Sequence, residues 1–201
     1  MGNTIQTEDR EVTIVSRYEE PLIAVLGNVL SDEECDELIS LSKEKLNRSK
    51  IGVTREVNEM RTSSSMYFQD AENDLITKIE KRVSSIMNVP VEHGDGIQIL
   101  KYTPGQEYKA HFDFFASSSK AAKNNRISTL VMYLNDVEQG GETFFPKLNL
   151  SVSPKKGMAV YFEYFYTDQI INEQTLHGGA PVITGEKWVA TQWMRKQKTT
   201  I

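Results

Sequence analysis

Residues 97–114, IQILKYTPGQEYKAHFDF, decide the fold, because two strand-like runs are separated there by the turn signal Pro104-Gly105. In residues 97–102 successive side chains alternate between two faces, with Ile97, Ile99 and Lys101 on one and Gln98, Leu100 and Tyr102 on the other. A period of two is typical of a β-strand. Residues 106–114 are also strand-like, so we expect this part of the chain to lie in a β-sheet.

Further strands are predicted on both sides of this stretch, wherever β-branched or aromatic runs are bounded by turn signals such as Gly140-Gly141. These runs cover residues 22–26, 127–134, 157–164, 174–177 and 188–194. The many short strands favour a β-sandwich or jelly roll.

Two helices are predicted between the strand at residues 22–26 and the later strands. Ser31-Asp32-Glu33-Glu34 has the pattern of a capping box, and apolar residues at helical spacing follow it across residues 32–46. A second apolar face covers residues 72–88, whereas residues 47–71 are expected to be extended or loop. The fold class is therefore predicted as α+β, with N-terminal helices packed on one sheet. We expect residues 1–17 to be a flexible lead-in and residues 18–201 to form a single domain.

The composition excludes several classes of protein. The chain has 201 residues, 39% of them hydrophobic, which is enough for one well-buried core. A net charge of −5 argues against a nucleic-acid partner, since phosphates require a basic surface. One cysteine, Cys35, excludes an internal disulfide and a cysteine-rich zinc or iron–sulfur site.

No apolar run approaches the roughly 18 residues that a membrane span requires. The opening residues MGNTIQTEDR lack the apolar segment of a signal peptide. A cytoplasmic protein without a membrane partner is the expectation.

Two of the three histidines lie in a pattern that can bind a metal ion. His111 and Asp113 are two residues apart on a strand-like run, so both side chains project from the same face. His177 follows on a distant strand and precedes a Gly178-Gly179 turn. Two imidazoles and one carboxylate are the diagnostic ligand set of mononuclear non-haem iron(II) oxygenases. A hydrolytic zinc site with the same ligands remains open at this point.

Lys187 lies ten residues after His177. If its side chain points into the same cavity as the metal ligands, it favours iron over zinc. A buried ammonium needs an anionic partner because its desolvation is costly. The distal carboxylate of a bound 2-oxo dicarboxylic acid would supply one, while the other end of that acid chelates iron. The alternative is a solvated lysine at the end of a strand.

With these residues, several ordered motifs resemble the prolyl 4-hydroxylase family over residues 20–196. They are Gln98-x-Leu100-x-Tyr102-x-x-Gly105-Gln106-x-Tyr108, Tyr133-Leu134-Asn135, Gly140-Gly141-Glu142-Thr143 and the segment 188–193. The resemblance implies a double-stranded β-helix fold and a dioxygenase that uses Fe(2+), 2-oxoglutarate and dioxygen, with L-ascorbate as a reductant.

The resemblance also implies roles for individual residues. Lys187 would anchor the C5 carboxylate of 2-oxoglutarate, Tyr102 and Thr143 would donate hydrogen bonds to it, and Trp193 would line the pocket. The residues implied to face a peptide substrate are Tyr108, Arg126 and Arg61. Simpler readings are core aromatics for Tyr102 and Trp193, and a rim charge for Arg126. Where family members often carry a histidine after the last tryptophan, this chain has Arg195, which leaves substrate contacts there in doubt.

The function implied is 4-hydroxylation of proline in a collagen-like or other proline-containing polypeptide. Two alternatives remain: a related oxygenase acting on lysine, a free amino acid or a nucleobase, and a non-catalytic module that binds proline-rich peptides. Residues 116–125 suit either a mobile lid or a plain surface loop. The sequence does not determine the oligomeric state, and a homodimer is the expectation.

Overall fold

The computed structural model describes residues 2–51, 56–165 and 170–199, and two antiparallel sheets dominate it. The nine-stranded sheet has the order β1 (Thr4–Gln6), β2 (Glu11–Tyr18), β3 (Ile23–Gly27), β14 (Ala159–Glu163), β10 (Arg126–Tyr133), β17 (Lys187–Arg195), β8 (Gln98–Tyr102), β7 (Ser64–Tyr67) and β4 (Asn47–Arg48). The four-stranded sheet has the order β13 (Leu150–Val152), β12 (Thr143–Phe145), β15 (His177–Gly179) and β9 (Tyr108–His111).

Shorter elements complete the chain. Two small hairpins pair β5 (Lys50–Ile51) with β6 (Glu56–Val57), and β11 (Gln139–Gly140) with β16 (Val182–Thr184). The helices are α1 (Asp32–Ser42) and α2 (Asp74–Met87), and the 3-10 turns are η1 (Val91–His93), η2 (Lys120–Asn124), η3 (Pro146–Leu148) and η4 (Glu173–Thr175). No helix among these described segments is long and apolar enough to span a bilayer.

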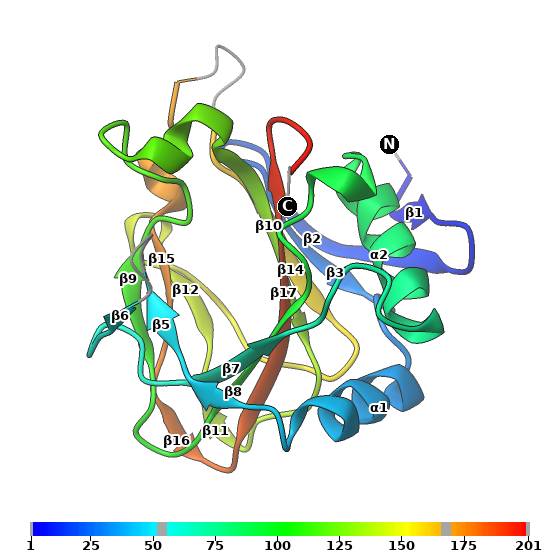
Figure 1. Ribbon diagram of the computed structural model, residues 1–201, viewed down its shortest axis with the longest axis vertical. Coiled ribbons are helices and arrows are strands. Elements are labelled where there is room, and N and C mark those ends of the chain that lie inside the picture. The colour runs from blue at the N-terminus through cyan, green and yellow to red at the C-terminus, as the bar shows by residue number, and fades with distance from the viewer. Residues whose placement is uncertain (1, 52–55, 166–169, 200–201) are drawn as a thin grey trace.

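The core has two layers, one on each face of the nine-stranded sheet. Figure 1 shows α1 and α2 on one side of this sheet and the four-stranded sheet on the other. The alternation predicted for β8 is confirmed, because Ile97 and Ile99 belong to the cluster beneath the helices. Leu100 and Tyr102 belong to the second cluster, which also contains Phe145 of the four-stranded sheet. β8 therefore contributes side chains to both layers, as expected for a strand buried on two faces.

The helix start predicted at Ser31 is confirmed. The Ser31 hydroxyl accepts a hydrogen bond from the Glu34 amide at 3.2 Å, and the Glu34 carboxylate accepts one from the Ser31 amide at 2.9 Å. The helix ends at Ser42 instead of residue 46, because the chain turns there and residues 47–48 pair with β7 as an edge strand.

The N-terminal prediction was wrong in its secondary structure. Residues 4–6 and 11–18 form β1 and β2, which continue the nine-stranded sheet beyond β3. Val12 is completely buried in the cluster beneath the helices, so this hairpin covers one end of the core. Val12, Ile14 and Val15 stand among polar residues, and whether such a run forms a strand depends on the partner strand it finds.

The strand predicted over residues 174–177 is also mostly wrong. Residues 173–175 form a 3-10 turn, because the Asn172 side chain accepts a hydrogen bond from the Gln174 amide at 3.0 Å. The strand begins only at His177, and Gly178 and Gly179 lie within it instead of forming a turn. A Cβ atom on Gly178 would come within 2.6 Å of the Phe144 ring, so glycine lets β15 lie close to β12.

A buried ion cluster fastens the N-terminal hairpin to both helices. The Arg82 side chain is completely buried and donates to the Glu34 carboxylate at 2.7 and 2.8 Å, and also to Asp9. Burial alone would raise the pKa of Glu34, but hydrogen bonds from Arg82 and from the Ser31 amide outweigh it and lower this pKa to about 2. The ionised carboxylate therefore stabilises the fold at neutral pH.

We expect Glu34→Gln to lower the free energy of unfolding by about 2 kcal/mol at pH 7. The folded-state pKa of Glu34 lies below its ordinary value of 4.5, so its contribution is complete above that pH and declines as pH falls toward about 2. The difference between wild type and variant should shrink across this range in urea titrations. Glu44→Gln, at an exposed glutamate, is the control. A difference that stays constant with pH would contradict the assignment.

Candidate active site

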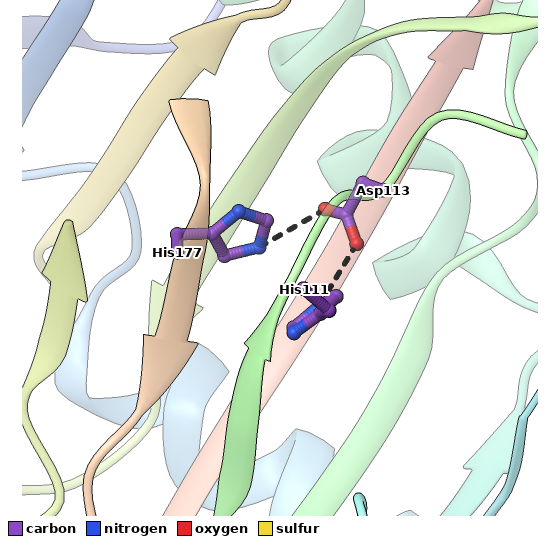
Figure 2. A group of neighbouring side chains, drawn as sticks. All are labelled: His111, Asp113 and His177. Atoms are coloured by element: carbon purple, nitrogen blue, oxygen red, sulfur yellow. Dashed lines mark ion pairs between the residues drawn. The ribbon is translucent and has the colours of Figure 1, made fainter. Parts of the chain in front are cut away.

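The structure brings His111, Asp113 and His177 together between the two sheets. β9 and β15 are antiparallel neighbours in which His111 and His177 are directly paired, so their side chains share one face. Asp113 follows two residues after His111, and one ligand atom from each residue lies within 4.8 Å of the others. Figure 2 shows the three side chains pointing toward one another.

The hydrogen bond made by Nδ1 of each imidazole determines that Nε2 faces the other metal-ligand candidates. His111 Nδ1 lies 2.8 Å from the Lys109 carbonyl oxygen, and His177 Nδ1 lies 3.0 Å from the Thr175 carbonyl oxygen. A carbonyl oxygen only accepts, so both Nδ1 atoms carry the hydrogen and donate it. In the neutral rings the Nε2 lone pairs then face Asp113, with distances of 3.2 Å to Oδ1 from His111 and 3.4 Å to Oδ2 from His177.

This arrangement fits a metal ion. Lone pairs on two nitrogens and a carboxylate repel one another unless a positive charge lies among them. Burial and the neighbouring His177 lower the pKa of His111, which disfavours a proton as that charge near neutral pH. Burial would raise the pKa of Asp113, but positive charge and hydrogen bonds from the imidazoles, His177 first, outweigh it and hold this pKa well below its usual range. A bound cation would favour the ionised carboxylate in the same way. The donor set is therefore prepared for a divalent cation with nitrogen and oxygen ligands.

Asp113 is held from the opposite sheet. Its Oδ2 atom accepts hydrogen bonds from Thr129 Oγ1 at 2.6 Å and from Trp193 Nε1 at 2.9 Å. Thr129 is on β10 and Trp193 is paired with it on β17, so both donors come from the nine-stranded sheet. Trp193, predicted to line the pocket, thus bonds directly to a metal-binding carboxylate.

Lys187 is not the solvated lysine of the alternative reading, because only 4% of it is exposed. Its ammonium lies 5.5 Å from the centre of the Tyr102 ring and 5.9 Å from that of Tyr133. Burial lowers the pKa of Lys187 to about 8, and attraction by Glu142 only partly opposes this. Within the described part of the chain Lys187 has no carboxylate at ion-pair distance, so an anionic ligand would supply the missing charge.

Thr143 and Tyr102 are both buried, and Tyr102 belongs to the cluster between the sheets. The Tyr133 hydroxyl donates to Thr143 Oγ1 at 2.8 Å, which leaves the Thr143 hydrogen available for a ligand. Tyr133 is part of the Tyr133-Leu134-Asn135 motif, but its contact with Thr143 was not predicted. Its inward position on a predicted strand was the one available signal. Hydrogen bonds from Tyr102 and Thr143 to a cosubstrate stay predictions.

Two of the residues predicted to face a substrate form a stack beside the metal ligands. The Tyr108 ring lies 3.5 Å from the His111 ring at an interplanar angle of 14°. The Arg61 guanidinium lies 4.9 Å from the centre of the Tyr108 ring and donates to Gln98 Oε1 at 2.9 Å. Their contact with a substrate stays a prediction.

Arg126 is not an isolated charge at the rim of the site, because its guanidinium contacts both an aspartate and a tryptophan. Its Nε atom donates to Asp95 at 2.7 Å, and its guanidinium lies 4.1 Å from the centre of a Trp193 ring. Arg195 also donates to Asp95, and it donates to the Asn124 carbonyl oxygen at 2.9 Å. Asp95 thus joins the two arginines, and the substrate role of Arg126 stays a prediction.

Residues 116–125 contain the turn η2 and are anchored at their end. The Asn125 side chain accepts from the Phe115 amide and donates to the Phe115 carbonyl oxygen, both at 2.8 Å. This side chain holds the two ends of the loop together. Motion of the intervening residues as a lid stays a prediction.

Comparison with known proteins agrees with this geometry. Residues 97–195 match the 2OG-Fe(II) oxygenase superfamily. "Probable prolyl 4-hydroxylase 10" of Arabidopsis thaliana is 37% identical over 96% of this chain and 75% of its own length. "Prolyl 4-hydroxylase 2" of the same plant is 38% identical over 87% of this chain and 67% of its own.

A solved structure extends the likeness to three dimensions. It is the viral collagen prolyl hydroxylase from Paramecium Bursaria Chlorella virus-1 in its 2OG complex, with a TM-score of 0.70 and 33% identity. The match covers 86% of this chain and 95% of the viral protein. The fold is therefore the predicted double-stranded β-helix, and the protein is an iron(II)- and 2-oxoglutarate-dependent dioxygenase. Within that class the chain belongs to the prolyl 4-hydroxylase family.

We expect His111→Ala and Asp113→Ala each to abolish succinate formation from 2-oxoglutarate, because each removes one of three metal ligands. Iron(II) binding, measured anaerobically by calorimetry, should be lost in parallel. The third histidine, His93, bonds to the Arg195 carbonyl oxygen outside the ligand set, so His93→Ala is the matched control. Full succinate formation by either ligand variant would remove the metal assignment.

We expect Lys187→Ala to raise the KM for 2-oxoglutarate by about 30- to 150-fold, since a charged hydrogen bond contributes about 2–3 kcal/mol. The control is Lys101→Ala, which removes a half-buried lysine paired with Glu186. An unchanged KM in Lys187→Ala would show that this ammonium does not bind the cosubstrate.

The same lysine predicts a pH dependence. Only the ammonium form pairs with a carboxylate, so kcat/KM for 2-oxoglutarate should fall as pH rises through about 8. The fall should be absent in Lys187→Ala.

Proposed function

We propose that this protein hydroxylates C4 of proline residues in a collagen-like or other proline-containing polypeptide, and converts 2-oxoglutarate to succinate and CO2. The carrying observation is the buried Lys187 ammonium between the same two sheets as the His111, Asp113 and His177 ligand set. Zinc-assisted hydrolysis does not in itself require such an ammonium, whereas a dicarboxylate cosubstrate that chelates the metal at one end is matched by one at the other. The printed names of the relatives direct the proposal to proline.

Bound iron(II) would supply the activation of dioxygen that is coupled to oxidative decarboxylation of the cosubstrate. The protein's part is to arrange the groups around it. His111, Asp113 and His177 would bind one side of the metal ion. Lys187 would orient the cosubstrate by its distal carboxylate. The Phe162 ring lies 4.5 Å from the His177 ring and excludes water from one flank of the centre.

The surroundings of the metal ligands suit a proline-containing peptide. Phe112 and Phe114 flank Asp113, are half-buried, and lie 4.9 Å apart between ring centres. Proline-rich segments form a stiff extended helix that packs on aromatic rings at low entropic cost. The Arg61 guanidinium lies 4.9 Å from the centre of the Tyr108 ring, so its charge is close to the aromatic ring that stacks on His111.

Several expectations are part of the same proposal. L-Ascorbate would keep the bound iron in its ferrous state, as the family resemblance implies. A cytoplasmic location and a homodimer stay predictions that rest on the sequence alone.

The test offers the protein a collagen-like repeat peptide and a proline-rich peptide without glycine repeats, with iron(II), 2-oxoglutarate and ascorbate. We expect a mass gain of 16 on proline, identified as 4-hydroxyproline by amino-acid analysis, in step with succinate. Peptides with alanine in place of proline, and the Asp113→Ala protein, serve as controls.

Other outcomes identify the alternatives. A gain of 16 on lysine, a free amino acid or a nucleobase would indicate a related oxygenase. Peptide binding without 2-oxoglutarate turnover would indicate a non-catalytic module. Comparing hydroxyproline across a proteome with and without the protein would then identify its natural substrate.

A further inference from the structure

The two oxygens of Asp113 have different surroundings. Oδ2 accepts hydrogen bonds from Thr129 and Trp193, at 2.6 and 2.9 Å. Oδ1 faces His111 Nε2 at 3.2 Å. Both oxygens face the ligand nitrogens, because Oδ2 also lies 3.4 Å from His177 Nε2 (Figure 2). Among the described residues only Oδ2 also accepts hydrogen bonds from Thr129 and Trp193, which leaves Oδ1 as the oxygen without such donors.

Thr129 has a second hydrogen-bond partner, Tyr164, which is not one of the three metal-ligand residues. Its Oγ1 atom is hydrogen-bonded to the Tyr164 hydroxyl as well as to Asp113. An ionised carboxylate only accepts, so Thr129 donates its one hydrogen to Asp113, and Tyr164 must donate to Thr129. The direction of both hydrogen bonds is therefore determined, from Tyr164 through Thr129 to Asp113.

The fold gives these two hydroxyls fixed positions. Thr129 is completely buried on β10, between Phe162 of β14 and Trp193 of β17. Tyr164 directly follows β14, is 1% exposed, and its amide bonds to the Ile127 carbonyl oxygen at 3.1 Å. Neither residue belongs to the group of side chains that could hold the metal ion, so any effect of theirs on the metal acts through Asp113.

We propose that Thr129 and Tyr164 are positioning residues of the iron centre, which hold Asp113 so that Oδ1 alone is offered to the metal. Two imidazole nitrogens and one carboxylate oxygen leave three of six positions open. A chelating 2-oxo acid and dioxygen need all three. A carboxylate free to rotate and bind through both oxygens would occupy one of them.

The test measures metal binding by the full chain without peptide or cosubstrate, using Mn(II) and the electron paramagnetic resonance signal of the free ion. Thr129→Val keeps the shape and removes the donor, and we expect the Kd to rise at least about tenfold. Thr129→Ser keeps the hydroxyl and should restore binding close to wild type. Tyr164→Phe should cause a smaller rise, on the order of threefold, because it only weakens the donor bonded to Asp113.

The double variant decides whether Tyr164 acts through Thr129. In the Thr129→Val background Tyr164→Phe should have no further effect on the Kd, since the hydroxyl between them is gone. The control is Tyr161→Phe, a buried tyrosine of β14 whose hydroxyl bonds to Glu163. It should leave the Kd unchanged.

The proposal is overturned if Thr129→Val binds Mn(II) like wild type, or if Tyr164→Phe acts equally in both backgrounds. It is also overturned if Tyr161→Phe raises the Kd as much as Tyr164→Phe does. Should Thr129→Val fail to fold, the comparison of Tyr164→Phe with Tyr161→Phe and of Thr129→Ser with wild type decides alone. The inference rests on the metal site and not on the substrate, so its failure leaves the proline assignment intact.

Discussion

The charge on Asp113 is the constraint on which the two-sheet arrangement depends. Asp113 is almost fully buried, and a buried carboxylate is costly unless donors or cations surround it. Its neighbours come from both sheets: His111 and His177 from the four-stranded sheet, and Thr129 and Trp193 from the nine-stranded sheet. One buried carboxylate therefore contacts both sheets and joins them at this point, inside a spacing that the apolar side chains between the sheets maintain.

Lys187 adds the opposite charge between the same sheets. An ammonium buried against the rings of Tyr102 and Tyr133 is only partly compensated, and its lowered pKa expresses the cost. The apo protein thus contains one negative centre with closely placed partners and one positive centre without them. A ligand that chelates at one end and carries a free carboxylate at the other satisfies both demands. If Lys187 binds the distal carboxylate as proposed, a preference for 2-oxoglutarate over a monocarboxylate is the expected consequence of this separation of charges.

The sequence predicted what periodicity and local chemistry determine. The two-residue spacing of His111 and Asp113, the alternation along β8 and the capping box at Ser31 all depend on neighbours in the chain, and all were predicted correctly. The pairing of β2 with β3 depends on tertiary contacts of Val12, and it was missed. The bond from Trp193 to Asp113 and the Tyr164–Thr129 pair join residues 35 to 80 positions apart, and no local pattern marks them. Burial of Lys187 likewise depends on where the strand β17 lies in the fold, which no local pattern predicts.

The turn η4 connects the metal centre to a part of the chain that carries no ligand. His177 Nδ1 bonds to the Thr175 carbonyl oxygen, and Thr175 Oγ1 donates to the Asn172 carbonyl oxygen at 2.7 Å. The Asn172 side chain in turn donates to Glu20 at 2.8 Å, in the connection between β2 and β3. The orientation of one imidazole is thereby linked, through Thr175, Asn172 and Glu20, to the connection between β2 and β3. The smallest unit able to bind iron well thus extends beyond the ligand-bearing strands, and trimming the chain from its N-terminus would act at a distance on the ring of His177.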